Sequence, residues 1–268
     1  MKLYHQVERV FNELRALGIA ADDPIDVARL VAFDQYHYLG TEAVDEAVRR
    51  LGLNPALQVL EVGSGIGGPS RHLAHSCGCQ MTALELQNDL HDTALQLTAR
   101  CGLDGRVRHV CGNVLDGVTP GGYDALVSWL TFLHIPERPQ LYARCFEALK
   151  PGGGIYVEDY FARGTLTDCE REILVREVFC EHVPDMDEYR AELRAAGFEN
   201  LELIDMSEAW AVFVQERWSG FRAMRERNMR LHGAEIIDGL EEFYSAVVEL
   251  FAGGNLGGIR FVANKPLQ

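Results

Sequence analysis

Positive charge is what this chain of 268 residues has little of. Lys and Arg number 25 against 40 Asp and Glu, so the formal net charge at pH 7 is −15. A surface that binds nucleic acid needs a basic patch to neutralise phosphates, and an anionic membrane attracts basic segments. The charge balance therefore predicts a protein that binds neither nucleic acid nor a membrane.

Long hydrophobic runs and paired cysteine motifs are also absent from the sequence. The longest apolar run, ALVSWLTFLHI, is shorter than the roughly 20 residues that span a bilayer. The first residues, MKLYHQVERVFNELRAL, form an amphipathic pattern with acids inside it, which is not typical of a signal peptide. The seven cysteines are odd in number and include no CxxC pair, which suits a reducing compartment, and Cys77 and Cys79 are expected to pack rather than to bind metal. We therefore expect a cytoplasmic protein without a metal site.

The order of apolar segments predicts an α/β fold. Strand LQVLEV is followed by helix GPSRHLAHSC, strand QMTALEL and helix DLHDTALQLTARCG, and the alternation continues to strand LELIDM. Such alternation is typical of βαβ units and of a parallel sheet buried on both faces. Three helices are predicted before it: residues 3–17, which include Leu3, then DDPIDVARLVAF with Asp23 as its cap, then TEAVDEAVRRLG, which ends at Gly52.

A helical stretch over residues 209–252 interrupts this order before a last strand, GGIRFVANK. We interpret it as an inserted cap. The expected organisation is an N-terminal helical segment that closes over the site (1–52), an α/β core (53–208), a helical cap (209–254) and the last strand of the core sheet (255–268).

The segment LEVGSGIGGPSRHLA places a glycine turn between a strand and a helix. Gly63, Gly65 and Gly68 satisfy the spacing of a dinucleotide-binding turn, and Gly67 in place of Gly68 fits E-x-G-x-G-x-G equally well. Glu85 ends the next strand and can accept hydrogen bonds from the ribose hydroxyls of NAD or of an adenosine. The turn alone leaves open a nicotinamide cofactor, an adenosyl cofactor and a purely structural role.

The residues around the turn distinguish these cofactors. Glu61 lies two residues before the first glycine, where it would meet the cationic amine of S-adenosylmethionine but would repel the pyrophosphate of NAD. Asn113, in GNVLD, can read an adenine amino group. A Lys-Pro-Gly-Gly turn then joins the fourth strand and its helix to the fifth strand, in YDALVSWLTFLHI…FEALKPGGGIYVEDY. From residue 57 to 160 these four motifs, in this order, resemble the class I S-adenosylmethionine-dependent methyltransferases.

This resemblance implies a Rossmann-like fold with a seven-stranded, mostly parallel sheet and a helical cap. The last strand is expected to be antiparallel and to lie beside the fifth. The implied cofactor is S-adenosylmethionine, bound at the glycine turn in the 53–208 core. The expected cofactor-binding residues are Tyr38, Gly40, Glu61, Gly63, Ser64, Gly65, Gly67, Glu85, Leu86, Asn113, Val114 and Trp129.

The turn GSGIGGPSRHLA is similar to that of the sterol, tocopherol, sarcosine/dimethylglycine and phosphoethanolamine methyltransferases, which act on small molecules. FDQYHYLGTEAVDEAVRRL and VEDYFARG resemble the phosphoethanolamine enzymes, and FYSAVVELFAGGNLGGIRFVANK resembles the sarcosine/dimethylglycine type. Two departures argue against phosphoethanolamine as the substrate. Leu130 stands where those enzymes have an acid, and an anionic phosphate would meet Glu177, Glu181 and Asp185.

His134 ends the fourth strand at TFLHIP, beside the expected cofactor cleft. A histidine can take a proton from an ammonium or hydroxyl group, and the phosphoethanolamine enzymes use a histidine at the matching position. Tyr160, in VEDY, matches a tyrosine that contacts substrate there, and Tyr36 is the nearest counterpart of the tyrosine that partners the histidine. We predict these three as catalytic residues, with purely structural roles as the alternative.

The predicted function is an S-adenosylmethionine-dependent methyltransferase for a small-molecule acceptor, with an amine nitrogen favoured. The alternative is O-, S- or C-methylation of a small carboxylate, thiol, phenol or prenyl compound. A non-catalytic cofactor-binding module and an NAD-dependent oxidoreductase are more distant alternatives. A solvated face is expected for the five cap arginines, although one or two could turn inward to bind a substrate carboxylate: Arg217, Arg222, Arg225, Arg227 and Arg230. The sequence leaves monomer and homodimer open.

Overall fold

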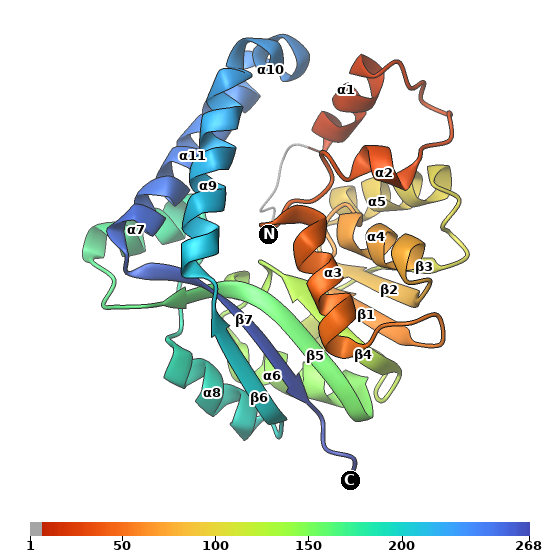
Figure 1. Ribbon diagram of the computed structural model, residues 1–268, viewed down its shortest axis with the longest axis vertical. Coiled ribbons are helices and arrows are strands. Elements are labelled where there is room, and N and C mark those ends of the chain that lie inside the picture. The colour runs from red at the N-terminus through yellow and green to blue at the C-terminus, as the bar shows by residue number, and fades with distance from the viewer. Residues whose placement is uncertain (1–6) are drawn as a thin grey trace.

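A seven-stranded sheet forms the centre of the protein (Figure 1). The computed structural model describes residues 7–268, so the first part of the helix predicted over residues 3–17, including Leu3, lies outside the described residues. The strand order is β3-β2-β1-β4-β5-β7-β6, and β7 runs antiparallel to both of its neighbours while the other pairs are parallel. The strands are β1 (Gln58–Val62), β2 (Gln80–Glu85), β3 (Val107–Cys111), β4 (Tyr123–Trp129), β5 (Leu149–Ala162), β6 (Glu199–Asp205) and β7 (Leu256–Asn264). The predicted sheet, with its antiparallel last strand beside the fifth, is confirmed.

Helices cover both faces of this sheet. The two short 3-10 helices are η1 (Val114–Asp116) and η2 (Phe132–His134). The α-helices are α1 (Glu8–Ala16), α2 (Val27–Leu30), α3 (Gly40–Leu51), α4 (Gly68–Ser76), α5 (Asn88–Arg100), α6 (Arg138–Ala148), α7 (Asp168–Glu177), α8 (Met186–Ala195), α9 (Ser207–Ala223), α10 (Arg225–His232) and α11 (Ala234–Gly253).

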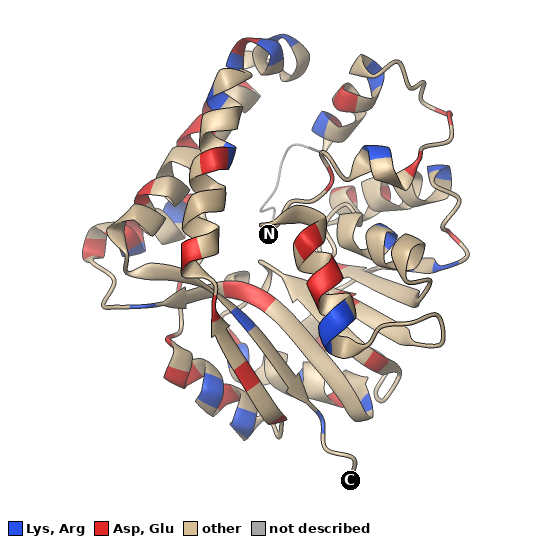
Figure 2. Ribbon diagram, viewed as in Figure 1, with Lys and Arg blue, Asp and Glu red and all other residues tan. Residues whose placement is uncertain are grey.

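The central strands are apolar along most of their length because both faces are buried. On one face, Val44 of α3 and Leu73 of α4 pack against strand residues such as Val59. On the other face, α6 and α8 contribute Leu141 and Leu193 to a second cluster. The charged residues accordingly lie mainly on the helices, and the strands are mostly uncharged (Figure 2).

The cap consists of three helices rather than one continuous stretch. α9 ends at Ala223, Met224 separates it from α10, and Gly233, with a φ of 92°, separates α10 from α11. Trp210 of α9 is buried against β7, where a Cβ atom on Gly258 would lie 2.2 Å from the indole ring. This close approach explains why residue 258 is a glycine, and it fixes α9 against β7.

The N-terminal helix meets the far end of the cap. Glu13 of α1 accepts from Arg227 of α10 with a nitrogen–oxygen distance of 2.6 Å, and His232 lies 3.0 Å from the same carboxylate. Burial lowers the pKa of His232, although Glu13 acts in the opposite direction. α1 and the cap thus approach each other above the sheet (Figure 1).

Two helix ends test the local predictions. Gly52 ends α3 in the left-handed conformation with a φ of 61°, as predicted. The prediction of Asp23 as the cap of the next helix is wrong, because Asp26 caps α2 by accepting from the Ala28 N–H. Asp23 instead accepts from the Ala20 N–H and closes the preceding turn.

Candidate active site

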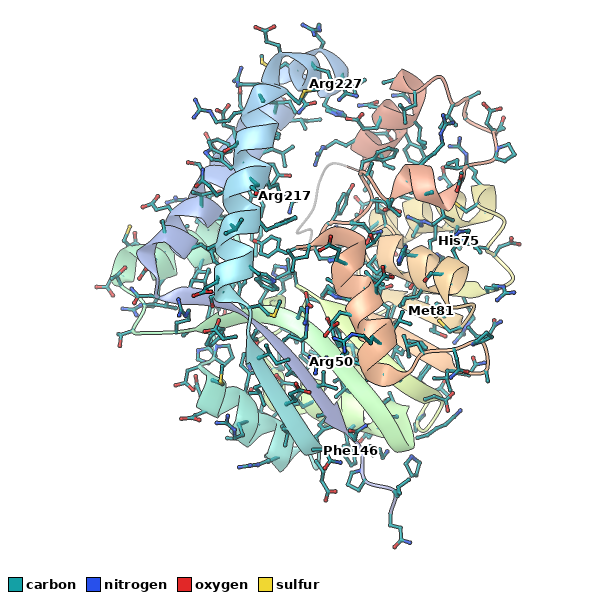
Figure 3. All side chains as sticks on the ribbon, in the orientation of Figure 1. Arg50, His75, Met81, Phe146, Arg217 and Arg227 are labelled. Carbon is teal, nitrogen blue, oxygen red and sulfur yellow. The ribbon has the colours of Figure 1, made fainter. Side chains whose placement is uncertain are left out.

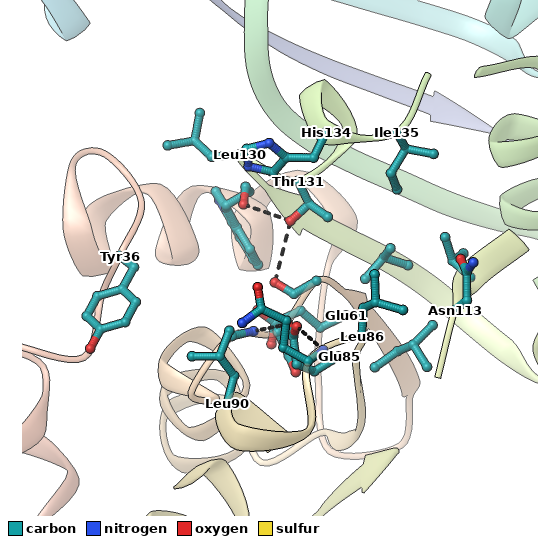
Figure 4. A pocket seen from close by; sticks show the side chains of 18 of the residues that line it. Tyr36, Glu61, Glu85, Leu86, Leu90, Asn113, Leu130, Thr131, His134 and Ile135 are labelled. Atoms are coloured by element: carbon teal, nitrogen blue, oxygen red, sulfur yellow. Dashed lines mark hydrogen bonds between the residues drawn. The ribbon is translucent and has the colours of Figure 1, made fainter. Parts of the chain in front are cut away.

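A cavity of about 350 Å³ opens at the carboxyl ends of β1, β2 and β4. The order of the strands reverses between β1 and β4, and ligands of open α/β sheets bind in the crevice at this point. We call it the glycine-turn cavity; Figure 4 shows its wall. Of the predicted site residues, its wall includes Tyr36, Glu61, Gly63, Ser64, Gly65, Glu85, Leu86, Asn113, Val114, Trp129 and His134.

The glycine turn runs from β1 into α4 and needs its glycines for two reasons. Gly63 and Gly65 have φ values of 74° and 54°, which a residue with a side chain adopts only under strain. A Cβ atom on Gly63 would also lie 2.1 Å from the Thr131 hydroxyl oxygen. The turn therefore packs directly against the loop that follows β4.

Glu61 is a buried carboxylate in the floor of this cavity. The Ser70 hydroxyl donates a hydrogen bond to it. Burial raises the pKa of Glu61 to about 8, even though Ser70 and the nearby Arg71 guanidinium act in the opposite direction. A cation brought beside this carboxyl group would favour its ionised form.

Glu85 is held by the backbone on both sides. Its carboxylate accepts from the N–H groups of Gly65 and Gln87, each at 2.8 Å (Figure 4). Burial nevertheless raises its pKa above the usual value. The contacts lock the orientation of the carboxylate, and each oxygen keeps a second lone pair for a ligand.

Polar atoms of three of the predicted residues also lie in this wall: Asn113, Ser64 and Trp129. The Asn113 side chain accepts from the Leu115 N–H at 3.0 Å and so also caps η1. Among the described residues, the Ser64 hydroxyl and the Trp129 indole nitrogen are buried without a hydrogen-bond partner. Buried polar atoms of this kind are uncommon in native structures and are a reason to look for a ligand.

Three residues predicted to bind the cofactor lie outside this wall. Gly40 begins α3, and Gly67, with a φ of 81°, precedes α4. A Cβ atom on Gly67 would meet Arg71 and His109 at 2.8 Å. Tyr38 lines a different cavity.

A second cavity, of about 290 Å³, lies between the N-terminal segment, the loop after β4, the end of α7 and the cap, and we call it the cap-side cavity. Its wall includes Tyr38 and Tyr160. The two cavities share four wall residues: Tyr36, Leu90, Leu130 and His134. Two of the three predicted catalytic residues therefore lie at the junction, and the third lies in the cap-side wall.

His134 is held at this junction by its ring nitrogen Nδ1, which lies 3.3 Å from the Phe179 carbonyl oxygen. Because a carbonyl only accepts, Nδ1 donates, and a neutral ring then has its basic lone pair on Nε2. Burial lowers the pKa of His134 to about 4, although the Phe179 carbonyl acts in the opposite direction. The imidazole is therefore neutral at physiological pH.

The loop that carries His134 is anchored by Asp159 of β5. Its carboxylate accepts from the Leu133 N–H at 2.9 Å and from the Tyr160 N–H at 2.7 Å. Burial raises the pKa of Asp159 to about 7. Leu130, at the start of the same loop, has a φ of 50°, a left-handed conformation that is rare for a residue with a Cβ atom.

The N-terminal segment is fixed over the glycine-turn cavity by a buried ion pair. Asp34 lies in the cavity wall and pairs with Arg71 of α4 at 3.0 Å. Further along, His37 stacks near Trp129, with 5.5 Å between ring centroids. The segment thus contacts both sides of the glycine-turn cavity.

The sequence prediction did not assign a site role to Arg9 or Tyr244, and it left Arg217 among five cap arginines. All three line the cap-side cavity. The signal for Arg217 was present, because Trp210, Phe213 and Arg217 follow one another at intervals of three and four residues. This spacing places them on one face of a helix, and Trp210 and Phe213 pack inward.

The antiparallel β7, the reversal of strand order at β1 and β4 and the glycine turn after β1 define the fold of the class I S-adenosylmethionine-dependent methyltransferases, as the sequence predicted. More particularly, residues 59–153 match the family described as "Methyltransferase domain".

The relatives agree with the predicted resemblance. The chain is 25% identical over 234 residues to phosphoethanolamine N-methyltransferase 1 of Zea mays, a match that covers 84% of this chain and 45% of that protein. It is 28% identical over 165 residues to sarcosine/dimethylglycine N-methyltransferase of Halorhodospira halochloris, covering 61% and 58%. The chain thus spans about half the length of these relatives. The similarity to both N-methyltransferase groups is confirmed.

A solved structure shows the same fold. Phosphoethanolamine N-methyltransferase 2 of Haemonchus contortus, in complex with phosphomonomethylethanolamine and S-adenosylhomocysteine, matches with a TM-score of 0.81 at 21% identity. The match covers 96% of this chain and 57% of that one.

No group of three or more His, Cys, Asp or Glu within residues 7–268 is arranged to hold a metal ion. None of the helices formed by this part of the chain combines the length and apolar character needed to cross a membrane.

Proposed function

We propose that the chain is an S-adenosylmethionine-dependent methyltransferase that transfers a methyl group to a small-molecule acceptor, with an amine nitrogen favoured. The observation that carries the proposal is the junction of the two cavities. A cavity with a glycine turn and two buried carboxylates meets a second cavity at a neutral histidine, His134. Cofactor and acceptor would approach each other there.

The residues of the glycine-turn cavity fit S-adenosylmethionine. The cofactor's ammonium group would place a cation beside the Glu61 carboxyl group, whose pKa burial raises to about 8. Glu85 has its orientation fixed by two N–H groups and keeps lone pairs for the ribose hydroxyls. The Ser64 hydroxyl and the Trp129 indole N–H, which have no hydrogen-bond partner within residues 7–268, would gain partners on the polar atoms of the cofactor. Asn113 and Leu86 would border the adenosine.

S-adenosylmethionine, when bound, supplies a methyl group on a positively charged sulfur. The chain contributes chiefly by aligning the acceptor with that methyl group, an effect that reaches about 7–11 kcal/mol in well-oriented model reactions. Leu130, Tyr36 and His134 would form the walls of the passage between the cavities and exclude water. A dry passage favours a reaction in which positive charge leaves the sulfur.

His134 would accept the proton that an ammonium group must lose to become a nucleophilic amine. Its basic lone pair is on Nε2, because Nδ1 donates to the Phe179 carbonyl. Tyr160 and Tyr36 would orient the acceptor from the cap-side wall and from the junction. Preference for nitrogen is supported by the N-methyltransferase relatives and by a histidine that is neutral at physiological pH.

The N-terminal segment (1–52) and the cap (209–254) would close over the site defined by the core (53–208) and the last strand (255–268). The contact between α1 and α10 and the buried Asp34–Arg71 pair support this division. We place the protein in the cytoplasm, which is supported by its seven free cysteines. Its negative charge supports a small-molecule partner in place of nucleic acid.

Calorimetry of the full chain with S-adenosylmethionine and with NAD tests the cofactor. S-adenosylmethionine should bind, and Glu85→Ala should weaken it by about 1.5–3 kcal/mol, the range for hydrogen bonds to a charged group. Glu199→Ala, on the exposed edge strand β6, is the matched control and should leave the affinity unchanged. Binding of NAD instead would indicate an oxidoreductase.

Release of S-adenosylhomocysteine from a panel of amines, amino acids, thiols, phenols and carboxylates tests the reaction. Turnover with a class of amines supports the proposal. Turnover only with oxygen, sulfur or carbon acceptors would overturn the preference for nitrogen, and tight cofactor binding without any turnover would indicate a non-catalytic module.

A further inference from the structure

Arg217 differs from the other cap arginines in its surroundings. Arg225 pairs with Asp238 and Glu241, Arg227 pairs with Glu13, and Arg222 is exposed. Arg217 instead lines the cap-side cavity, on the side of α9 that faces the N-terminal segment (Figure 3). No Asp or Glu among residues 7–268 forms an ion pair with it.

A second cation enters the cavity from the opposite wall. Arg9 of α1 lines the same cavity and likewise lacks an ion pair with any described carboxylate. Within residues 7–268 its Nε atom is buried without a hydrogen-bond partner. Two guanidinium groups from segments more than 200 residues apart thus face one partly buried space. A buried charge without a counter-charge is costly.

Tyr244 of α11 lines the same cavity and contacts Arg217. Arg217 donates to its hydroxyl at 3.3 Å, and the guanidinium carbon lies 4.9 Å from the ring centroid. Burial raises the pKa of Tyr244, but the positive charges of Arg217 and Arg9 outweigh it, and the pKa lies below the usual value. The local potential in this part of the wall is therefore positive.

The remainder of the wall is largely apolar. Leu130, Val178, Leu240 and Phe243 face the same space. The acidic wall residue, Glu177, is paired with Arg176 at 2.7 Å and is therefore not the missing counter-charge. A ligand that matches this cavity has an apolar skeleton and one negative group.

We propose that the cap-side cavity binds an acceptor whose carboxylate is held by Arg217 and Arg9 and whose apolar skeleton contacts Leu240 and Phe243. The assignment of this ligand as the methyl acceptor rests on the proposed function. A guanidinium group presents two parallel N–H donors that match a carboxylate. A singly charged carboxylate fits better than a phosphate dianion, because the remainder of the wall is largely apolar and burying a second negative charge there would cost more desolvation.

The experiment compares acids with their uncharged amides in the full chain. The probes are octanoate, 3-phenylpropionate and indole-3-acetate, each with the matching carboxamide, and 3-phenylpropylphosphonate. Binding is measured by calorimetry with and without S-adenosylhomocysteine, on wild type, Arg217→Gln and Arg222→Gln. Arg222→Gln is the matched control, because it removes the same charge from an exposed position on the same helix.

At least one acid should bind wild type about tenfold more tightly than its amide, and Arg217→Gln should abolish this difference while Arg222→Gln retains it. The proposal is overturned if no acid is preferred over its amide, if Arg217→Gln retains the preference, or if the phosphonate binds more tightly than the carboxylate. Thermal unfolding of Arg217→Gln with S-adenosylhomocysteine reports whether the variant is folded. Acid preference without cofactor binding would retain this cavity assignment while rejecting the proposed function.

Discussion

The hydroxyl groups of Tyr38 and Tyr160 lie 2.5 Å apart, although 122 residues separate them in the chain. Tyr38 also packs edge-on against Trp210 of the cap, with 4.7 Å between ring centroids. One side chain of the N-terminal segment thus contacts both β5 and α9. It does so in the wall of the cap-side cavity rather than beside the glycine turn.

Tyr38→Phe removes the hydroxyl group and keeps the ring. Loss of this buried hydrogen bond should lower the free energy of unfolding by about 1–2 kcal/mol, measured by urea denaturation. The affinity for S-adenosylmethionine should be unchanged, because Tyr38 does not line the glycine-turn cavity. A large loss of cofactor affinity would instead support the sequence prediction that Tyr38 binds the cofactor.

Cofactor binding should release a proton from Glu61. With a pKa of about 8, this carboxyl group is about nine-tenths protonated at pH 7, and a neighbouring ammonium group should ionise it. Calorimetry at pH 7 in buffers of different ionisation enthalpy should therefore report about 0.9 proton released per cofactor bound. At pH 9.5 the group is already ionised, and the release should disappear. Glu61→Gln should abolish the release at pH 7, and a wild-type enthalpy independent of buffer at pH 7 would contradict the assignment.

His134→Ala should lower turnover by about 10²–10⁴-fold, the usual range for general acid–base catalysis, and leave cofactor affinity nearly unchanged. The pKa of His134 is about 4, so its neutral, basic form should persist down to about pH 5 and be lost as pH falls through 4. The acid limb of kcat/KM due to this residue should therefore lie near pH 4 and be absent from His134→Ala. A limb at higher pH that persists in the variant belongs to another group, such as the amine acceptor. A variant with a near-normal rate would leave His134 a structural residue.

Asp34→Ala should destabilise the protein by about 3–5 kcal/mol, because it leaves the buried Arg71 guanidinium without its counter-charge. Asp168→Ala is the matched control, since its pair with Arg171 is exposed and is worth about 0–1 kcal/mol. Urea denaturation of both variants provides the comparison. Equal losses would mean that the Asp34–Arg71 pair is not formed in solution.

The core of the fold was predictable because its signals are local. Buried parallel strands appear in the sequence as short apolar runs. Gly52 ends a helix because glycine adopts the left-handed conformation without strain. The position of β7 beside β5 came from the family resemblance, since no local pattern determines which strand a last strand joins. The cap of α2 was misplaced because both Asp23 and Asp26 are good capping residues, and the competing turn at Ala20 decides between them.

Site residues near the ends of strands could be predicted from the sequence. Site residues that are positioned by packing between distant segments were harder to predict. Glu61 and Glu85 end adjacent parallel strands, so their place at one sheet edge follows from the order of elements. The orientations of Tyr38, Arg9 and Arg217 depend on how α1 and the cap approach the core, and that approach is set by contacts between distant segments. Helical periodicity indicated the inward face of α9 but not which cavity it would border.

Leu130, at the junction of the two cavities, is in a left-handed conformation that costs about 1–3 kcal/mol for a residue with a side chain. Glycine would adopt this conformation without strain, but Leu130→Gly would also remove a side chain that packs against the apolar cluster around Leu133 and Trp210. The same substitution would widen the junction of the two cavities and admit solvent there. The strained conformation of Leu130 therefore places a bulky apolar side chain at the point where the two cavities meet.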